Sequence, residues 1–380
     1  MILNIKILFI CSSYLIILIL FPLKIFSLNC DSIKFPRECH CQRSRQLTHE
    51  YPNKIRLKCR QINFLKKNFS STNISFDRLI FETTNDNLTL TNSILANLNT
   101  RILRFHVENL FLQKTIFKNA TIGQLLITND NAYAGINFDN SNSSFSHSII
   151  DKLELKSIDF QNPIVESIFS NSIIQTLTIQ SSKFYGFHHS NSSKFSLKIF
   201  SIISSLNLTN LTDNYLPQNL EQSQFEQINF LDNQISHLNA FVFHSFERFT
   251  GKLNLENNRI LSIDSNAFRR LFSIKILSLK KNLFKQIPKK LFIDCQQLTN
   301  LDLSFNQLNS FEKNLFDNLE QLEILILNHN PIEFIHSETF LNLKQLKQIH
   351  FEHVHILQQD SISWLWNLAN SNVIHLLKTE

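Results

Sequence analysis

Four segments with the same spacing decide the fold: LNLENNRI at residues 253–260, LSLKKNLF at 277–284, LDLSFNQL at 301–308 and LILNHNPI at 325–332. Each segment begins 24 residues after the one before it. Apolar residues alternate with other residues at the start of each segment, which is typical of a short strand that buries one face. A unit of this size cannot enclose a core by itself, so successive units have to stack.

The same spacing continues in both directions along the chain. Ile349 and Phe351 follow after a further 24 residues, and Ile228 and Phe230 precede by 25. Weaker apolar pairs continue upstream at Leu206/Leu208, Leu177/Ile179, Leu153/Leu155, Leu125/Ile127, Leu103/Phe105, Leu79/Phe81 and Ile55/Leu57. We therefore expect about 13 strands, one for each repeat.

Two further positions recur with the repeat. Five consecutive repeats carry an Asn at the turn that leaves the strand, where its amide can bond to main-chain groups that the turn removes from water. These residues are Asn233, Asn258, Asn282, Asn306 and Asn330. Upstream, Ile158 and Leu211 occupy this position and cannot form such bonds, so we expect the register or the loop shape to differ there. An aromatic column should pack as a spine on the convex side, formed by Phe243, Phe268, Phe292, Phe316, Phe340 and Trp364.

This pattern resembles the extracellular leucine-rich repeat family, specifically its 24-residue class. The resemblance is strong over residues 225–356 and weak over 76–224. It implies an α/β-type solenoid, a leucine-rich repeat horseshoe with a parallel concave β-sheet and about 13 repeats. The expected division is a signal peptide at 1–27, an amino-terminal cysteine cap with the first strand at 28–67, irregular glycosylated repeats at 68–224, regular repeats at 225–356, and an atypical terminal repeat or cap at 357–380.

The amino terminus predicts entry into the secretory pathway. Residues 7–21 are strongly apolar, follow Lys6 and precede a small residue at Ser27, which is typical of a cleaved signal peptide. The alternatives are a buried core helix and an uncleaved signal anchor, although the stretch is shorter than the ~20 residues that span a bilayer. We expect a mature, extracellular chain that begins near Leu28.

The cysteines agree with an oxidising compartment. Cys30, Cys39, Cys41 and Cys59 lie within thirty residues and predict two disulfides. A zinc site is the alternative, but the spacing lacks paired CxxC arms. The family resemblance implies the pairs Cys30 with Cys41 and Cys39 with Cys59. Cys295 occupies an inward position of its repeat, so we expect a buried free thiol, with an intermolecular disulfide as the alternative.

Eight Asn-x-Ser/Thr sequons support the same route. They are Asn68, Asn73, Asn87, Asn119, Asn142, Asn191, Asn207 and Asn210. All of them precede residue 211, so glycans at these sites would leave the regular repeats bare.

The bare half is the expected site of function. Side chains that flank the inward leucines should point outward from the concave sheet, where polar residues surround a few apolar ones, as at protein–protein interfaces. The candidate partner-binding residues are Lys252, Glu256, Lys275, Lys280, Lys281, Asp302, Phe305, Asn328, His329, His350 and His353. We predict a secreted or cell-surface protein that binds a protein ligand or receptor through this face, in adhesion, receptor signalling or matrix organisation.

Charge offers an alternative from another class. Basic residues are concentrated at 28–67 and again at 269–290, within a chain of formal net charge +6. The second group comprises Arg269, Arg270, Lys275, Lys280, Lys281, Lys285, Lys289 and Lys290. Such patches would suit a matrix protein that binds sulfated polysaccharide. The opposing interpretation is that neighbours neutralise them, as Glu256 beside Lys280 on the adjacent strand would do. Secretion argues against nucleic acid, and a membrane is involved only if the signal segment stays uncleaved.

The sequence offers no catalytic motif. Four glycines among 380 residues cannot supply a GxGxxG fingerprint or a P-loop, and neither GxSxG nor HExxH occurs. His329, His350 and His353 lack a known zinc spacing, so a polar or pH-sensitive surface is the better interpretation. We therefore expect no enzyme activity, no cofactor and no metal.

Overall fold

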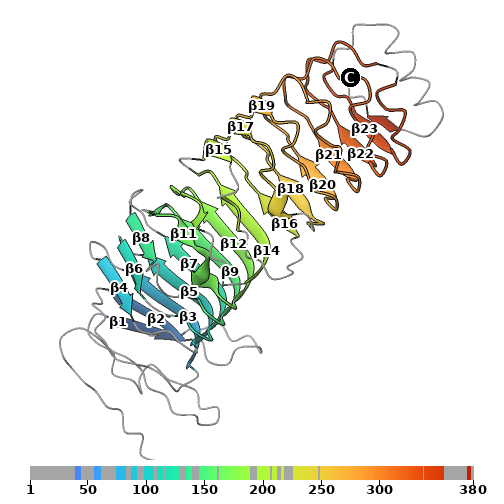
Figure 1. The fold of residues 1–380 in the computed structure, drawn as a ribbon. Coiled ribbons are helices and arrows are strands. Elements are labelled where there is room, and N and C mark those ends of the chain that lie inside the picture. The colour runs from blue at the N-terminus through green and yellow to red at the C-terminus, as the bar shows by residue number, and fades with distance from the viewer. Residues whose placement is uncertain are drawn as a thin grey trace, which may run out of the picture. The chain divides into compact units, whose positions relative to one another are not determined.

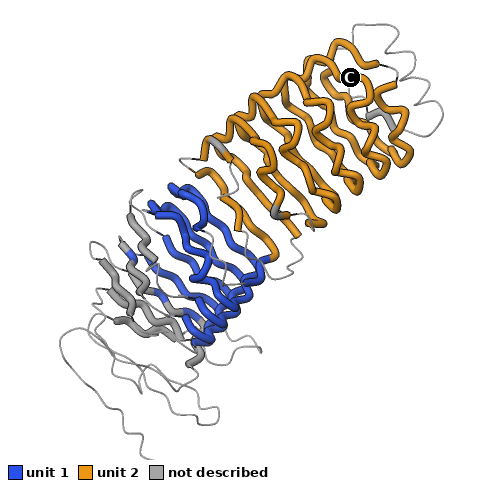
Figure 2. The backbone as a smooth tube through the Cα atoms, in the orientation of Figure 1, with its two compact units in different colours: residues 1–197, 219–222 blue, residues 198–218, 223–380 orange. Residues whose placement is uncertain are grey.

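The chain is divided into two compact units in this computed structural model (Figure 2). Unit 1 comprises residues 1–197 and 219–222, and unit 2 comprises 198–218 and 223–380. The structure describes residues 39–43, 55–60, 74–82, 87–91, 98–106, 109–113, 117–128, 134–138, 145–160, 162–188, 195–205, 208–211, 215–217, 226–246, 249–336, 338–354 and 375–377. The predicted signal peptide, Cys30 and Trp364 lie outside these residues.

Unit 1 contains a main sheet of long strands (Figure 1). In sheet order they are β1 (Cys39–Arg43), β2 (Ile55–Arg60), β3 (Ile74–Glu82), β5 (Leu98–His106), β7 (Thr121–Thr128), β9 (Ile149–Lys156) and β12 (Ile173–Gln180). β1 and β2 are antiparallel, and the later neighbours are parallel. Leu103, Leu125, Leu153 and Leu177 are in register across the strands and fully buried, which is the row that the alternation predicted.

The segments that leave these strands form a second parallel sheet. Its strands are β4 (Asn87–Thr91), β6 (Asn109–Gln113), β8 (Ala134–Phe138) and β10 (Ile158–Phe160), and a two-stranded sheet pairs β11 (Ile164–Val165) with β13 (Phe187–His188). Between β11 and β12 lies a 3-10 helix, η2 (Glu166–Phe169). Ile158 occupies the position at which the unit 2 repeats carry Asn, and it lies in β10. Its N–H donates to the Ser182 hydroxyl of the next repeat at 3.0 Å.

Unit 2 has shorter strands and a more regular step. They are β14 (Ser196–Ile203, which begins in unit 1), β16 (Gln227–Asn229), β18 (Lys252–Asn254), β20 (Ile276–Ser278), β21 (Asn300–Asp302), β22 (Ile324–Ile326), β23 (Gln348–His350) and β24 (His375–Leu377). Neighbours in this order are parallel. The return segments contain β15 (Asn210–Leu211), β17 (His237–Leu238), β19 (Ser262–Ile263) and the 3-10 helix η4 (His244–Phe246).

These features confirm the predicted leucine-rich repeat solenoid with its parallel sheet. Each repeat contributes one strand to the main sheet, and the core is the row of inward residues behind it. In the part of the chain that the structure describes, the return segments consist of turns, 3-10 helices and short strands instead of α-helices. This suits a repeat of about 24 residues, which leaves little chain for a full helix after the strand and two turns.

One predicted strand is wrong. Leu206 lies outside the described residues, and Leu208 is not in the main sheet, because β14 ends at Ile203 and places Phe200 opposite Ile228 of β16. Phe200 and Ile202 are the inward residues, and Leu208 is buried beside β15. The pairs Phe200/Ile202 and Leu206/Leu208 both show the alternation of a strand, so the spacing of apolar residues alone could not decide which pair lies in the main sheet. The corrected register places Ser205, and not Leu211, five residues after the first inward residue.

In unit 2 the asparagines bond consecutive turns to one another. Asn282 Nδ2 donates to the carbonyls of Leu255 and Leu279, both at 3.0 Å, and its Oδ1 accepts from Ile260 N–H at 3.1 Å. Asn233, Asn258, Asn306 and Asn330 are buried in the same way, and each donates to a main-chain carbonyl of the preceding repeat. The amide thus satisfies groups from two repeats at once, which the flanking leucines cannot do.

Two phenylalanine spines fill the side of the core away from the main sheet. In unit 2, Phe243, Phe268, Phe292, Phe316 and Phe340 follow one another with ring centroids 5.8–6.5 Å apart. Unit 1 has a spine that the sequence analysis missed, Phe117, Phe145, Phe169 and Phe195, with centroids 4.9–5.5 Å apart. Its signal was available, because the first three of these residues lie eight positions before Leu125, Leu153 and Leu177.

Gly251 is required by a close approach of two repeats. A Cβ at this position would lie 1.9 Å from the carbonyl oxygen of Glu226. We expect Gly251→Ala to lower the free energy of unfolding by about 1–3 kcal/mol, because the two backbones must separate. Lys275→Ala changes the equivalent position of the next repeat and is expected to cost less than about 0.5 kcal/mol. Equal midpoints of urea unfolding for the two variants would contradict this account.

Asn282 and Asn306 test what the amide oxygen contributes. Both donate through Nδ2 to two carbonyls, but the Oδ1 atom of Asn306 is buried and has no hydrogen-bond partner among the described residues. Asn282→Ala should therefore destabilise the protein by about 1 kcal/mol more than Asn306→Ala, since it also leaves Ile260 N–H unpaired. Thermal unfolding measures the difference, and a larger loss for Asn306→Ala would refute the assignment.

Candidate functional site

The outward side of the unit 2 sheet collects most of the predicted partner-binding residues. We define the sheet face as the outward side of residues 227–232, 252–257, 276–281, 300–305, 324–329 and 348–353, which are the main-sheet strands β16, β18, β20, β21, β22 and β23 and the turns that follow them. It holds Lys252, Glu256, Lys280, Lys281, Asp302, Phe305, Asn328, His329, His350 and His353. Lys275 immediately precedes β20 at the edge of this face, where its Nζ bonds to Gln297 Oε1 at 3.2 Å.

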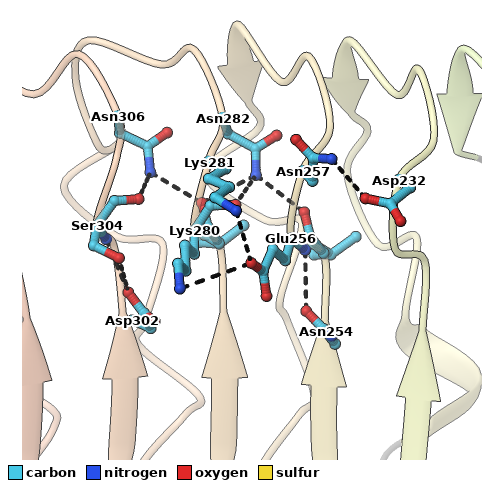
Figure 3. Close-up of polar contacts among 12 residues, drawn as sticks. Asp232, Asn254, Glu256, Asn257, Lys280, Lys281, Asn282, Asp302, Ser304 and Asn306 are labelled. Carbon is cyan, nitrogen blue, oxygen red and sulfur yellow. Dashed lines mark hydrogen bonds and ion pairs between the residues drawn. The ribbon is translucent and has the colours of Figure 1, made fainter. Parts of the chain in front are cut away.

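Polar contacts link neighbouring repeats across the sheet face (Figure 3). Lys280 Nζ and Lys281 Nζ each lie 3.8 Å from the same oxygen of Glu256. The N–H of Glu256 donates to Oδ1 of Asn254, the last residue of β18, at 3.0 Å. The predicted neutralisation of Lys280 by Glu256 therefore exists, but one carboxylate serves two ammonium groups.

Each turn of the sheet face ends in a residue with left-handed backbone. These residues directly precede the position of the recurring Asn (Asn233, Asn258, Asn282, Asn306 and Asn330), which we call the ladder position. Their φ angles are 58° at Asp232, 55° at Asn257, 54° at Lys281, 55° at Phe305, 54° at His329 and 53° at His353. Asn and Asp accept this conformation readily, whereas it is unfavourable for a bulky side chain such as that of Phe305. The sequence does not reveal this column, because the φ angle is not visible in a pattern of residue types.

The bulky members of this column stack on one another. The rings of Phe305 and His329 have centroids 4.1 Å apart, and those of His329 and His353 are 4.4 Å apart. We call these three residues the aromatic stack. Lys280 Nζ lies 5.7 Å from the Phe305 ring centroid, within the range of a cation–π contact. Phe305 remains 41% exposed, so the stack offers apolar surface to solvent.

Aliphatic side chains extend this apolar surface along the strands. Ile276 of β20 is 37% exposed, and Ile324 and Ile326 of β22 are half-buried on the same side of the sheet. Polar neighbours surround them: Asp302 accepts from Ser304 N–H at 2.9 Å and from its hydroxyl at 2.6 Å. An apolar centre with a polar surround has the composition of a protein-binding surface.

The basic segment at 269–290 does not form one surface. Arg269 pairs with Asp294 at 2.9 Å, and the second carboxylate oxygen of Asp294 accepts from Arg270 N–H at 2.8 Å. Lys280 and Lys281 lie on the sheet face, whereas Lys285, Lys289 and Lys290 belong to the return segment. The residues that are consecutive in the sequence therefore point to different sides of the coil.

Unit 1 carries a separate charged cluster on the outward side of its own sheet. Glu154 is nearly buried and contacts Lys152 at 3.1 Å, Lys156 at 3.3 Å and Gln124 Nε2 at 2.6 Å. Burial raises the pKa of Glu154, but the hydrogen bonds from Gln124 and Lys152 and the charges of both lysines outweigh burial, and the pKa lies below its ordinary value.

The remaining predicted sites are only partly within the described residues. The backbone register of β1 and β2 places Cys39 opposite Cys59. Asn119 is exposed in the turn before β7, and Asn87 and Asn210 lie in β4 and β15. The sequons at Asn68, Asn73, Asn142, Asn191 and Asn207 lie outside the described residues.

Cys295 and metal binding can be addressed from the described residues. Cys295 is fully buried and free, and burial, together with the charge of Asp294, raises the pKa of its thiol to about 12. A thiol of this kind is inert toward exchange. No three His, Cys, Asp or Glu side chains are grouped as metal ligands in the described ranges. Those ranges also contain no helix that is long and apolar enough to cross a bilayer.

Glu154→Gln should lower the free energy of unfolding at pH 7 by about 1–2 kcal/mol, because charge-assisted hydrogen bonds are lost. Since the folded pKa of Glu154 lies below its ordinary value of 4.5, the stabilisation is complete above pH 4.5 and disappears as the pH falls through the folded pKa. Urea unfolding of both proteins at pH 7, 4.5 and 3 measures this. A difference that stays constant with pH would rule out the carboxylate as its origin.

A family model agrees with the repeat of unit 2. Residues 251–308 and 296–356 match the family model described as leucine rich repeat. Among solved structures, a chain of the Toll–Spatzle complex, a molecular hub in Drosophila development and innate immunity, is 14% identical with a TM-score of 0.48; the match covers 92% of this chain and 59% of that one. No curated protein matches the sequence. The described fold is a leucine-rich repeat solenoid, and residues 251–356 carry its repeat.

Proposed function

We propose that the chain is a secreted or cell-surface recognition protein that binds a protein partner through the sheet face of unit 2. The observation that carries this proposal is the aromatic stack, because it is exposed and stands at left-handed positions. Whether the binding serves adhesion, signalling or matrix organisation depends on the partner.

The cost of the left-handed positions supports a functional role for their side chains. Asp232 and Asn257 occupy the same position in earlier repeats, so the turn accepts residues that adopt φ near 55° readily. A non-glycine residue in this region costs about 1–2 kcal/mol, and Phe lacks the local hydrogen bonds with which Asn and Asp reduce that cost. Backbone strain of this kind concentrates at functional sites. Phe305 therefore reduces stability at a place where the fold does not need a ring.

The chemistry of the surface supports a protein as the partner. Exposed aromatic residues dominate the binding energy of protein interfaces when they enter a pocket that excludes water. The sheet face combines the aromatic stack with Ile276 and Ile324, and polar side chains surround both. A rigid sheet also loses little conformational entropy on binding, which favours affinity.

Three sequence features support the extracellular part of the proposal. Residues 7–21 have the composition of a signal peptide. The register of Cys39 opposite Cys59 is compatible with the proposed disulfide between them. A glycan on the exposed Asn119 would belong to unit 1, and the last sequon precedes residue 211, so the sheet face would carry none.

Phe305→Asn tests the proposal, because it relaxes the backbone while it removes the ring. We expect the free energy of unfolding to stay within about 1 kcal/mol of wild type, since relief of strain offsets the lost stacking. Capture of extracellular partners by the tagged, glycosylated chain should fall by about tenfold or more, as for an interface anchor. Quantitative mass spectrometry after proximity labelling measures the captured proteins.

Phe241→Asn is the matched control. Phe241 is also exposed, at 49%, and has φ of 57°, but it lies in the turn after β17, away from the sheet face. This variant should retain capture. Equal capture by wild type and Phe305→Asn, or equal loss in both variants, would sink the assignment to the sheet face.

A further inference from the structure

The geometry points to an acidic partner segment, and this inference rests on the proposed function. We propose that a partner carboxylate binds at the corner formed by Lys280 and Lys281, while an adjacent apolar side chain of the partner lies against Phe305. The inference concerns which chemistry the sheet face recognises, not whether it binds a protein.

Unequal ion pairing leaves positive charge at this corner. Lys280 and Lys281 share the single carboxylate of Glu256, and both N–O distances are 3.8 Å, longer than the 2.7–2.9 Å of a charge-assisted hydrogen bond. The lysine side chains are 31% and 49% exposed, against 26% for Glu256. An ammonium group has three N–H donors, so both lysines can donate hydrogen bonds to a further carboxylate.

The carboxylates nearby are bonded within the protein. Asp302 accepts two hydrogen bonds from Ser304, and Asp232 accepts from Asn257 Nδ2 at 2.5 Å. One oxygen of each of these carboxylates is therefore already bonded, whereas the two ammonium groups share a single carboxylate. Lys252 of β18 lies on the same face and adds to the positive potential. Charge complementarity thus favours an acidic partner over a basic one.

The aromatic stack begins directly beside the lysines. Lys281 precedes Phe305 in the left-handed column, and Lys280 Nζ lies 5.7 Å from the Phe305 ring centroid. Neighbouring strands of a sheet are about 4.8 Å apart. Adjacent side chains of one partner segment can therefore reach Lys281 and Phe305 at the same time. An extended segment with an acidic residue near an aromatic or aliphatic one matches this spacing. A sulfated polysaccharide would use the lysines but gain little from the ring.

A library of random displayed 12-residue peptides provides an unbiased probe. Selection on the full glycosylated chain, with elimination of peptides that also bind Phe305→Asn, should enrich sequences that combine Asp or Glu with a neighbouring aromatic or aliphatic residue. Enrichment of basic or uncharged peptides, or no enrichment at all, would overturn the inference.

Charge variants then provide a test in which the sign of the effect is diagnostic. Lys281→Gln should weaken the selected peptide at least fivefold, and Glu256→Gln should tighten it at least twofold, because it removes the competing carboxylate. Lys285→Gln changes an exposed lysine of the same repeat away from the sheet face and should leave the affinity unchanged. The effect of Lys281→Gln should shrink as salt rises from about 50 to about 500 mM, because salt screens the interaction between charges. Weaker binding by Glu256→Gln would contradict the inference.

The outcomes separate this inference from the proposed function. If Phe305→Asn abolishes capture of extracellular proteins but the selected peptides are not acidic, the sheet face is a binding site with another chemistry. If the wild-type chain binds heparin, Lys281→Gln abolishes that binding and Phe305→Asn leaves it intact, a polysaccharide is the occupant and the acidic-segment inference fails.

Discussion

Every other feature of this protein depends on the burial of one repeat's apolar face against the next. A repeat of about 24 residues has no interior of its own, so Leu253, Leu277, Leu301 and Leu325 are buried only because neighbours cover them. Parallel main-chain hydrogen bonds keep these residues in one row. The spacing of the repeat is therefore constrained, and the phenylalanine spines behind the row share the same period.

The two units meet the requirements of the turn in different ways. In unit 2 a buried Asn bonds to carbonyls of two successive repeats, and the strand ends abruptly after three residues. In unit 1 the described residues at this position are Ile158, which cannot form such bonds, and Ser182, whose hydroxyl accepts from Ile158 N–H. The backbone there pairs with itself in the second parallel sheet, which includes β10. Both solutions give hydrogen-bond partners to main-chain groups of the turns, which is the condition for stacking polar turns in a solenoid.

The inward positions of each repeat require particular residue types, whereas the outward positions can vary. Between the inward leucine and the ladder Asn, the fold determines the backbone but not the residue, as Asp232, Lys281 and Phe305 show at one and the same position. The exposed ring at Phe305 and the paired lysines beside it are compatible with the fold without being demanded by it. For this reason the sheet face is where recognition can be specified.

Sequence alone determined the period, the strand row, the Asn positions and the unit 2 spine, because each repeats at a constant spacing that stacking imposes. It did not place the strand at Phe200, since Phe200/Ile202 and Leu206/Leu208 show the same alternation. The phenylalanine spine of unit 1 was also not predicted. Sequence also predicted Glu256 beside Lys280, but tertiary structure decided the other contacts across repeats: Lys281 with Glu256, Arg269 with Asp294, and the rings of Phe305, His329 and His353. Such contacts depend on the left-handed backbone and on the close approach of neighbouring coils, and neither is encoded in the spacing of residue types.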